Sequence, residues 1–332
     1  MTRLDVVAIG HALVDVISSE ADAFVVEHGL ERGVMTLVDA DRSLTLYAAM
    51  GPAIEMSAGS AANTIMGLGS LGGAAGYIGR VGDDELGDVF VHDIRAFGIE
   101  HLALARAACE PTGRCLVVVT PDAQRTMSTF LGAAARLGPD DLDVELIARA
   151  QVLYLEGYLW DDEQAKAALR RAARTAHDAG NRVALTLSDP FCVDRHRSEF
   201  LALIDDDVDV LFANEAEIES LYEVDEFDLA LQLVRDHCEI AALTRSEKGS
   251  LIVTRDEVHL IDAAPVTDVV DTTGAGDLYA AGFLHGLTHG YDLGTAGRLG
   301  SLAAAEVIGH LGARPQESLA ELARPLLEAG AR

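Results

Sequence analysis

The sequence has few cysteines, few aromatic residues and few positive charges. Its 332 residues include 4 Cys and 25 Lys plus Arg against 54 Asp plus Glu, and the formal net charge is -29. The cysteines are scattered, without a C-x-x-C pair or a histidine at ligand spacing, which disfavours a structural zinc site. The acidic charge argues against polyanionic partners, so we expect no binding to nucleic acid or to an anionic membrane.

Long apolar runs and the commonest nucleotide-binding motif are also missing. No stretch of 18 apolar residues occurs, and the N-terminal segment turns acidic at Asp5, so we expect a cytoplasmic protein with neither signal peptide nor transmembrane helix. No G-x-x-x-x-G-K-[ST] sequence occurs, which excludes a P-loop NTPase. The stretch from Gly67 to Gly72 formally matches G-x-G-x-x-G, but it follows a helical stretch instead of a strand. We therefore interpret its glycines as contacts for close helix packing.

The sequence does contain 49% hydrophobic residues, 31 glycines and a regular alternation of two kinds of segment. Short β-branched runs alternate with longer stretches of helical period from residue 60 onward, a pattern typical of βαβ units with a mostly parallel sheet. The expected strands cover 6–9, 75–78, 152–155, 183–187, 208–212 and 240–244, with a hairpin at 251–254 and 258–261. The expected helices cover 61–71, 86–97, 162–179, 215–222, 275–290, 293–308 and 318–329.

One region departs from this alternation. Two β-rich runs, 113–120 and 125–130, flank the turn residues Pro121 and Asp122 and predict an antiparallel hairpin. A parallel sheet does not normally contain such a hairpin in its interior, so we expect a small β-lid beside the main body. Because no linker rich in Pro, Gly or Ser divides the chain, we predict one α/β domain over residues 1–332 together with this lid.

The most informative stretch is Asp271-Thr-Thr-Gly-Ala-Gly-Asp277, which follows an apolar run and opens the helix expected at 275–290. Small residues at a helix N-terminus leave backbone N–H groups free, and the helix dipole adds positive charge there, so the stretch predicts an anion site. Asp277 lies at the rim of the same turn, where it can accept a proton from an attacking hydroxyl. This layout suits phosphoryl transfer to an alcohol. The alternative is a glycine-rich turn capped by an aspartate.

The stretch resembles the C-terminal signature of the ribokinase-like (PfkB-type) carbohydrate and nucleoside kinases. The N-terminal signature of this family is matched by Gly59-Ser-Ala-Ala-Asn63-Thr, by Gly72-Gly73 and by Tyr77-Ile-Gly-Arg-Val-Gly-Asp-Asp84. The resemblance covers essentially the whole chain. It implies an α/β ribokinase-like fold: a three-layer α/β/α sandwich with a mostly parallel central sheet and a small β-sheet lid, whose strands come from about 11–45 and 100–130. It also implies an ATP-dependent small-molecule kinase.

The resemblance further implies roles for individual residues. Asp277 would be the base that activates the substrate hydroxyl. The amides of Gly274, Ala275 and Gly276 would form the anion hole, and Asp15 would accept hydrogen bonds from two substrate hydroxyls. The other substrate-binding residues implied are His11, Leu13, Gly59, Ser60, Asn63 and Arg125, the last placed in the lid to close on the phosphates. The residues implied for ATP are Asn214, Thr244, Ser246, Lys248, Gly249, Thr273, Gly274 and Gly276.

Two acidic residues are candidates for metal binding. The resemblance implies that Glu217, in the element Asn214-Glu-Ala-Glu217, helps to organise Mg²⁺ through water. The same spacing also predicts a capped helix start with Asn214 as the N-cap, and both interpretations can hold together. The resemblance also implies that Asp271, with carbonyls near Thr273, could form the site of a monovalent cation such as K⁺.

The resemblance implies a small-molecule substrate, either a nucleoside or a sugar. Several stretches resemble the adenosine kinase branch, among them Gly10-His-Ala-Leu-Val-Asp15 and Asn181-Arg-Val-Ala-Leu-Thr-Leu-Ser188. His11 stands where adenosine kinases usually carry Asn, however, and Asp271 is more typical of sugar kinases. The matching stretches lead us to expect phosphorylation of adenosine at its 5′-hydroxyl. The two departures leave a kinase of fructose, ribose or 2-keto-3-deoxygluconate as an alternative, with a non-catalytic binding relative as a further one. The sequence leaves monomer and homodimer open.

Overall fold

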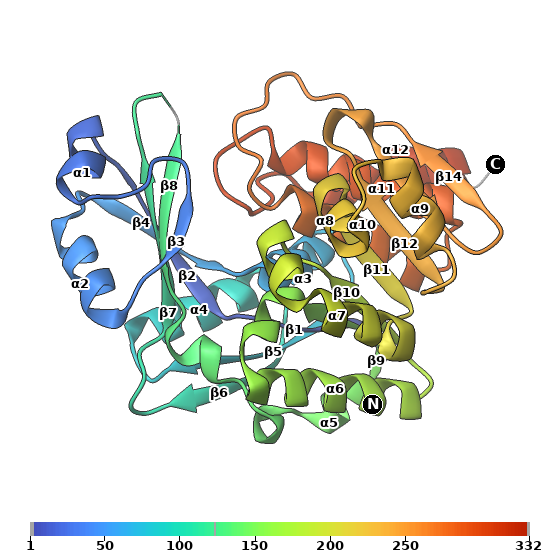
Figure 1. Cartoon of the computed structure of the whole chain (residues 1–332), viewed down its shortest axis with the longest axis horizontal. Helices are drawn as coiled ribbons and strands as arrows, with labels where there is room; N and C mark the ends of the chain where they lie inside the picture. The colour runs from blue at the N-terminus through green and yellow to red at the C-terminus, as the bar shows by residue number, and fades with distance from the viewer. Residues whose placement is uncertain (1–2, 123, 331–332) are drawn as a thin grey trace.

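Two separate β-sheets organise the chain in the computed structural model, which describes residues 3–122 and 124–330 (Figure 1). The larger sheet has nine strands in the order β14-β13-β12-β11-β10-β9-β1-β5-β6. In this order, the strands from β12 to β6 all run parallel to one another. Strand β13 is antiparallel to β12, and β14 is antiparallel to β13. Their bounds are β1 (Leu4–Ile9), β5 (Ala75–Gly82), β6 (His101–Ala107), β9 (Ala150–Glu156), β10 (Arg182–Thr186), β11 (Val210–Asn214), β12 (Ile240–Thr244), β13 (Ser250–Val253) and β14 (Val258–Ile261).

Helices cover both faces of the large sheet. One face packs against α3 (Ser60–Ser70), α4 (Glu85–Ala96), α10 (Ala275–Thr288) and α11 (Leu293–Val307). The other packs against α5 (Val144–Ala148), α6 (Glu163–Asp178), α7 (Pro190–Asp207), α8 (Glu215–Tyr222) and α9 (Phe227–Val234). The last helix, α12 (Leu319–Gly330), packs on α11. Across the described ranges, no helix is both long and apolar enough to cross a membrane.

The double burial explains why the central strands are continuous apolar runs. In β1, Val6 and Ala8 point into the core beneath α3 and α10, whereas Val7 and Ile9 point into the core beneath α6. All four side chains are fully buried, because helices cover a parallel sheet on both sides. The predicted α/β/α sandwich with a mostly parallel sheet is confirmed.

The second sheet is small and stands beside the main body (Figure 1). Its order is β3-β8-β7-β2-β4. Its outer face packs Val16 and Leu116 against Leu46 of α2 (Ala40–Ala49), and α1 (Asp22–Glu27) follows β2 in the chain. Side chains alternate along a strand, so the odd-numbered residues of β2 and β7 lie on the opposite face. The strands are β2 (Leu13–Ser19), β3 (Met35–Leu37), β4 (Ala53–Ala58), β7 (Gly113–Val119) and β8 (Arg125–Phe130).

The membership of this sheet differs in part from the expected ranges. The predicted hairpin at 113–120 and 125–130 is present as β7 and β8. The expected strand range of 100–130 also contained His101–Ala107, which instead pairs in parallel with β5 in the large sheet. Conversely β4, at 53–58, lies outside both expected ranges. Neither β6 nor β4 carries a sequence signal for one sheet or the other, and only the strand pairing assigns them.

The large sheet brings α3 and α10 into close contact, and this contact determines the position of the site. A Cβ atom added at Gly67 would lie 2.5 Å from Leu278 and 2.8 Å from Ala281, so only glycine permits this approach. The prediction that the glycines of 67–72 serve helix packing, and not a dinucleotide, is confirmed for Gly67. As a result the first turns of α3 and α10 lie side by side.

Candidate active site

The predicted anion site is the turn that opens α10. Gly274 has a positive φ of 79°, and a Cβ there would lie 2.6 Å from Cβ of Ala313, so both backbone and space require glycine. A Cβ on Gly276 would meet nothing within 4 Å, and no described group accepts its amide N–H. The Ala275 amide donates to Thr272 at 3.2 Å. The turn thus has a free donor and open space at a helix N-terminus, the two features that an anion site requires.

Asp277, in the first turn of α10, is held by two donors from α3. The Ser60 hydroxyl donates to its Oδ1 at 2.6 Å, and the Asn63 amide donates to its Oδ2 at 2.7 Å. Ser60 and Asn63 are three residues apart and therefore share one face of α3. Burial raises the pKa of Asp277 to about 6, opposed by these hydrogen bonds and assisted by the charge of Glu156. The carboxylate is therefore ionised at neutral pH and more basic than an ordinary aspartate.

Arg314, which the sequence did not indicate, lies against the same cluster. Its guanidinium donates to Oδ1 of Asn63 and to the carbonyl of Ser57, and it donates to the Ser57 hydroxyl at 3.2 Å. Burial lowers the pKa of Arg314 to about 10, while Asp15 and Asp277 act in the opposite direction. Arg314 is thus a partly buried cation near both predicted functional carboxylates. It follows α11 in a loop outside both family signatures, where no local pattern identifies it.

Asp15 belongs to a row of side chains that crosses the small sheet. Strand register pairs Asp15 with Cys115 and with Met56, pairs Cys115 with Thr129, and pairs Thr129 with Leu37. Directly paired residues point to the same face, so all five side chains share the face opposite α2. Burial raises the pKa of Asp15 to about 6, although the nearby cations Arg314 and Arg125 lower it.

An ion pair joins the small sheet to the turn of the anion site. Nη2 of Arg125, the first residue of β8, lies 2.5 Å from Oδ2 of Asp271, and its Nη1 donates to the Thr273 hydroxyl at 3.1 Å. Asp271 also accepts from the amides of Gly312 at 2.8 Å and Thr273 at 3.1 Å. Both of its oxygens are therefore engaged, and a monovalent cation here would have to replace some of these donors. The cation site stays a prediction.

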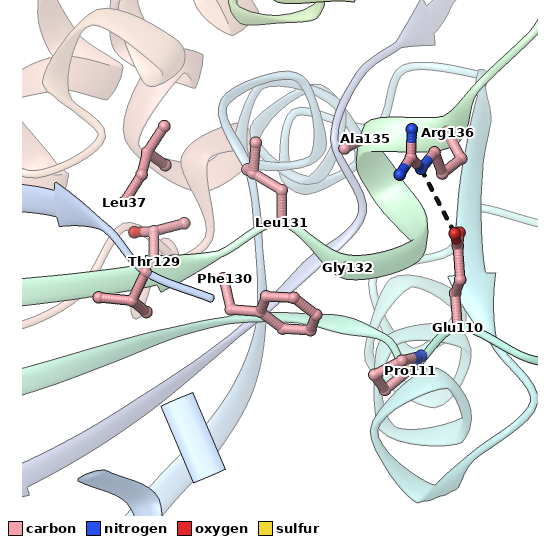
Figure 2. A pocket seen from close by; sticks show the side chains of 10 residues that line it. Leu37, Glu110, Pro111, Thr129, Phe130, Leu131, Gly132, Ala135 and Arg136 are labelled. Carbon is pink, nitrogen blue, oxygen red and sulfur yellow. Dashed lines mark ion pairs between the residues drawn. The ribbon is translucent and has the colours of Figure 1, made fainter. Parts of the chain in front are cut away.

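A groove opens at the end of the small sheet that carries β3 and β8 (Figure 2). It has a volume of about 310 Å³, and its polar edge is an ion pair between Glu110 and Arg136 at 3.3 Å. Two of its lining residues, Leu37 and Thr129, belong to the row that contains Asp15. Leu37 is 55% exposed. The lining residues are Leu37, Val38, Glu110, Pro111, Thr129, Phe130, Leu131, Gly132, Ala135 and Arg136.

Glu156, at the end of β9, is a second residue that sequence reasoning did not assign. It is 1% exposed, accepts from the Ala61 amide at 3.0 Å, and lies 3.4 Å from Nδ1 of His11. Gly59 packs on the carbonyl of His11, which a Cβ there would approach to 2.1 Å. His11 is thus enclosed by Glu156 and Gly59. Leu13 begins β2, two residues farther along the chain.

The residues predicted to bind ATP lie at the carboxyl ends of β11 and β12. Asn214 and Thr244 pair across these strands, at the edge where ligands of parallel sheets bind. Ser246 has a φ of 51°, a left-handed conformation that glycine adopts more readily than serine. Lys248 lies 3.3 Å from Glu215. Gly249 closes this turn with a φ of 81°.

Glu217 is the candidate for Mg²⁺. It completes a capping box with Asn214, whose amide N–H donates to it at 3.0 Å, so the helix-cap interpretation is confirmed. Burial raises the pKa of Glu217 to about 7. Each of its oxygens accepts one hydrogen bond from Asn214 and retains a free lone pair, which fits contact with a hydrated cation through water. Across the described residues, no group of three acidic, histidine or cysteine side chains forms a metal cage.

The three raised carboxyl pKa values predict how stability changes with pH. A carboxyl whose pKa is higher in the folded than in the unfolded state stabilises the fold at low pH, and this contribution is lost as the pH rises through the folded value. Asp15 and Asp277 titrate at about 6 and Glu217 at about 7, whereas His285, with a pKa lowered to about 4, acts in the opposite direction. We expect the thermal midpoint of the ligand-free protein to fall between about pH 5 and pH 8.

Thermal unfolding at constant ionic strength measures this dependence. Glu217→Gln should flatten the slope, because it removes one of the three titrating groups. Asp122→Asn is the matched control, since the pKa of Asp122 is lowered to about 2 and does not titrate in this range. A midpoint that rises from pH 5 to pH 8 would contradict the assignment.

Three comparisons place the chain among known proteins. The profile of the pfkB family carbohydrate kinases matches residues 51–319. The adenosine kinase of Sinorhizobium meliloti is 50% identical, with a TM-score of 0.91 over 98% of this chain and 99% of that chain. A probable sugar kinase protein from Rhizobium etli CFN 42 is 47% identical, with a TM-score of 0.92 over 100% of both chains. The adenosine kinase of Saccharomyces cerevisiae is 26% identical over 328 residues, which cover 92% of this chain and 95% of the yeast protein.

Proposed function

The chain belongs to the pfkB family of carbohydrate kinases, and from that premise we propose that it transfers the γ-phosphate of ATP to the 5′-hydroxyl of adenosine. That it is an ATP-dependent small-molecule kinase follows from the family and from its 50% identity to an adenosine kinase. The substrate is the proposed part, and the geometry of the small sheet supports it.

The observation that carries the proposal is the position of the groove relative to Asp15. A nucleoside has vicinal hydroxyls beside an aromatic base whose flat faces pack well on apolar side chains. Asp15 can accept from the hydroxyls, and the row from Asp15 through Cys115 and Thr129 ends at the exposed Leu37, which lines the groove. A hexose or pentose has no large apolar part to fill such a groove. The row therefore favours a nucleoside over a free sugar.

Asp277 would act as the general base. Its Oδ atoms take the proton of the 5′-hydroxyl as that oxygen bonds to the γ-phosphorus, and the bond from phosphorus to the β-phosphate oxygen breaks to release ADP. The free amide of Gly276 and the α10 dipole stabilise negative charge on the transferred group. Arg125 lies at the same turn and can follow the phosphates when the small sheet closes. Glu217 would hold a hydrated Mg²⁺ through water, and the bound ion would supply positive charge that offsets the charge of the ATP phosphates.

ATP consumption measured against a panel of nucleosides and sugars tests this proposal. Adenosine should be turned over most efficiently, and turnover of adenosine at least tenfold slower than that of a sugar would overturn it. The 47% identity to a probable sugar kinase makes fructose, ribose and 2-keto-3-deoxygluconate the appropriate alternatives. Tight binding of a ligand with no turnover of any candidate would support a non-catalytic relative instead.

Leu37→Ser gives a sharper prediction for the groove. Loss of apolar contact with the base should raise the KM for adenosine by roughly 5- to 30-fold, the usual worth of burying part of a leucine, and leave the KM for ATP unchanged. Leu44→Ser is the matched control, because Leu44 is 53% exposed on α2, on the far side of the small sheet. Equal KM values for adenosine in both variants would remove the groove from the substrate site.

A further inference from the structure

The orientation of the Asn63 amide is chemically demanding. Its Nδ2 donates to the carboxylate of Asp277 and its Oδ1 accepts from the guanidinium of Arg314. If the amide rotated by half a turn, its oxygen would face a carboxylate and its nitrogen would face a cation, so both contacts would become repulsive. Asn63 alone has no preference between the two orientations. Asp277 and Arg314, on opposite sides of the amide, therefore select the same orientation, and Arg314 adds its preference to that of the carboxylate.

We propose that Arg314 is a positioning residue for the kinase reaction: it locks the Asn63 amide in the orientation that donates to Asp277 and so holds the carboxylate ready to accept the substrate proton. The inference rests on the proposed role of Asp277 as the base. Nothing in the resemblance to the family assigns a role to Arg314.

The anchoring of Arg314 suits this task. A planar guanidinium presents several donors in fixed directions, and here the group that meets Asn63 also donates to the carbonyl and hydroxyl of Ser57 in β4. Ser57 is itself fixed, because its amide donates to Asp93 of α4 at 2.8 Å. Arg314 is thereby anchored to the small sheet by Ser57 while it contacts Asn63 of α3.

The positive charge of Arg314 and the orientation that it favours for the Asn63 amide both stabilise the ionised form of Asp277. It lowers the pKa of Asp277, which burial and Glu156 raise. Without Arg314, loss of a cation and loss of an oriented donor would both favour the protonated carboxyl. The titratable groups that interact electrostatically with Asp277 or Arg314 are Glu156, Tyr154, Tyr158, Glu217, Asp15, Asp93 and Tyr77. None of the carboxylates among them can replace the donor to Asp277.

A double-mutant cycle tests the inference with the phosphoryl acceptor that the substrate panel identifies. Single-turnover rates are measured against pH for wild type, Arg314→Met, Asn63→Ala and the double variant. Each single substitution should slow phosphoryl transfer by roughly 10- to 100-fold, the usual loss when a buried hydrogen-bonding partner is removed. The acid limb of Arg314→Met should also move up by about one pH unit. In the Asn63→Ala background, Arg314→Met should have only about a two- to threefold further effect on the rate.

Two results would overturn the proposal: rate losses that multiply in the double variant, or an unshifted acid limb in Arg314→Met. If Arg314→Met does not fold, Arg314→Lys replaces it in the cycle, because lysine keeps the stem and charge without the planar fork. Wild-type rates in Arg314→Lys would show that the fork is not needed. Arg298→Met, an exposed position on α11, is the control and should leave rate and pH profile unchanged.

The outcome for Asp277→Asn separates this inference from the proposed function. If that variant keeps the wild-type rate, Asp277 is not the base and both ideas fall. If it loses activity while the cycle is additive, only the role of Arg314 falls.

Discussion

Asp277→Asn is expected to lower kcat by roughly 10²–10⁴, the usual worth of a positioned general base, with little change in substrate affinity. The asparagine retains the size of the side chain and cannot accept the hydroxyl proton. In the wild type, the rate should fall below about pH 6, because protonation of Asp277 removes the same function. Steady-state kinetics, together with direct binding of the acceptor, separates the two effects.

A helix-cap aspartate remote from the site is the appropriate control for that substitution. Asp292 caps α11 and accepts from the Thr295 amide at 2.9 Å, so Asp292→Asn changes the same group at a similar helix position. It should retain wild-type kcat. Wild-type turnover in Asp277→Asn would refute the assignment of the base.

Asp15→Ala should instead act on binding. A hydrogen bond to a charged acceptor contributes about 1.5–3 kcal/mol, so loss of the contact to the substrate hydroxyls should weaken acceptor binding by about 10- to 100-fold. The kcat at saturation should change much less, because Asp15 takes no part in proton transfer. Calorimetric titration of the acceptor, alongside KM and kcat, measures both consequences.

Asp22→Ala provides the comparison within the same small sheet and its helices. Asp22 begins α1 and pairs with Arg32 at the surface, at 2.6 Å, so its loss changes the charge of this region without touching the site. Its acceptor affinity should remain that of the wild type. An unchanged KM in Asp15→Ala would contradict a hydroxyl-binding role for Asp15.

Much of the main body could be predicted because its signals are local. The strand predicted at 240–244 is β12, and the helix predicted at 215–222 is α8, with the cap that the spacing of Asn214 and Glu217 indicates. The motif that opens α10 was equally informative. A left-handed glycine, a helix start and a carboxylate within one turn are properties of a few consecutive residues.

The small sheet was predicted less well because pairing decides its membership. The sequence of β6 was expected in the small sheet, but this strand pairs in the large one. The strand β4 belongs to the small sheet, although its residues lie outside both expected ranges. The row from Asp15 to Leu37 draws on four different strands, so no single segment reveals it. Its apolar end, which carries the substrate proposal, becomes visible only when the register of β2, β7, β8 and β3 is known.

The sequence by itself therefore determined the sandwich, the kinase family and the residues that act within one turn of a helix. Only the tertiary structure identified Arg314 and Glu156 as residues of the site. Arg314 is 251 positions from Asn63, and Glu156 is 95 positions from the Ala61 amide that it accepts from. The physical reason is the range of the interactions. Helical period, capping and backbone conformation depend on neighbouring residues, whereas a buried charge finds its partners only after the core has packed.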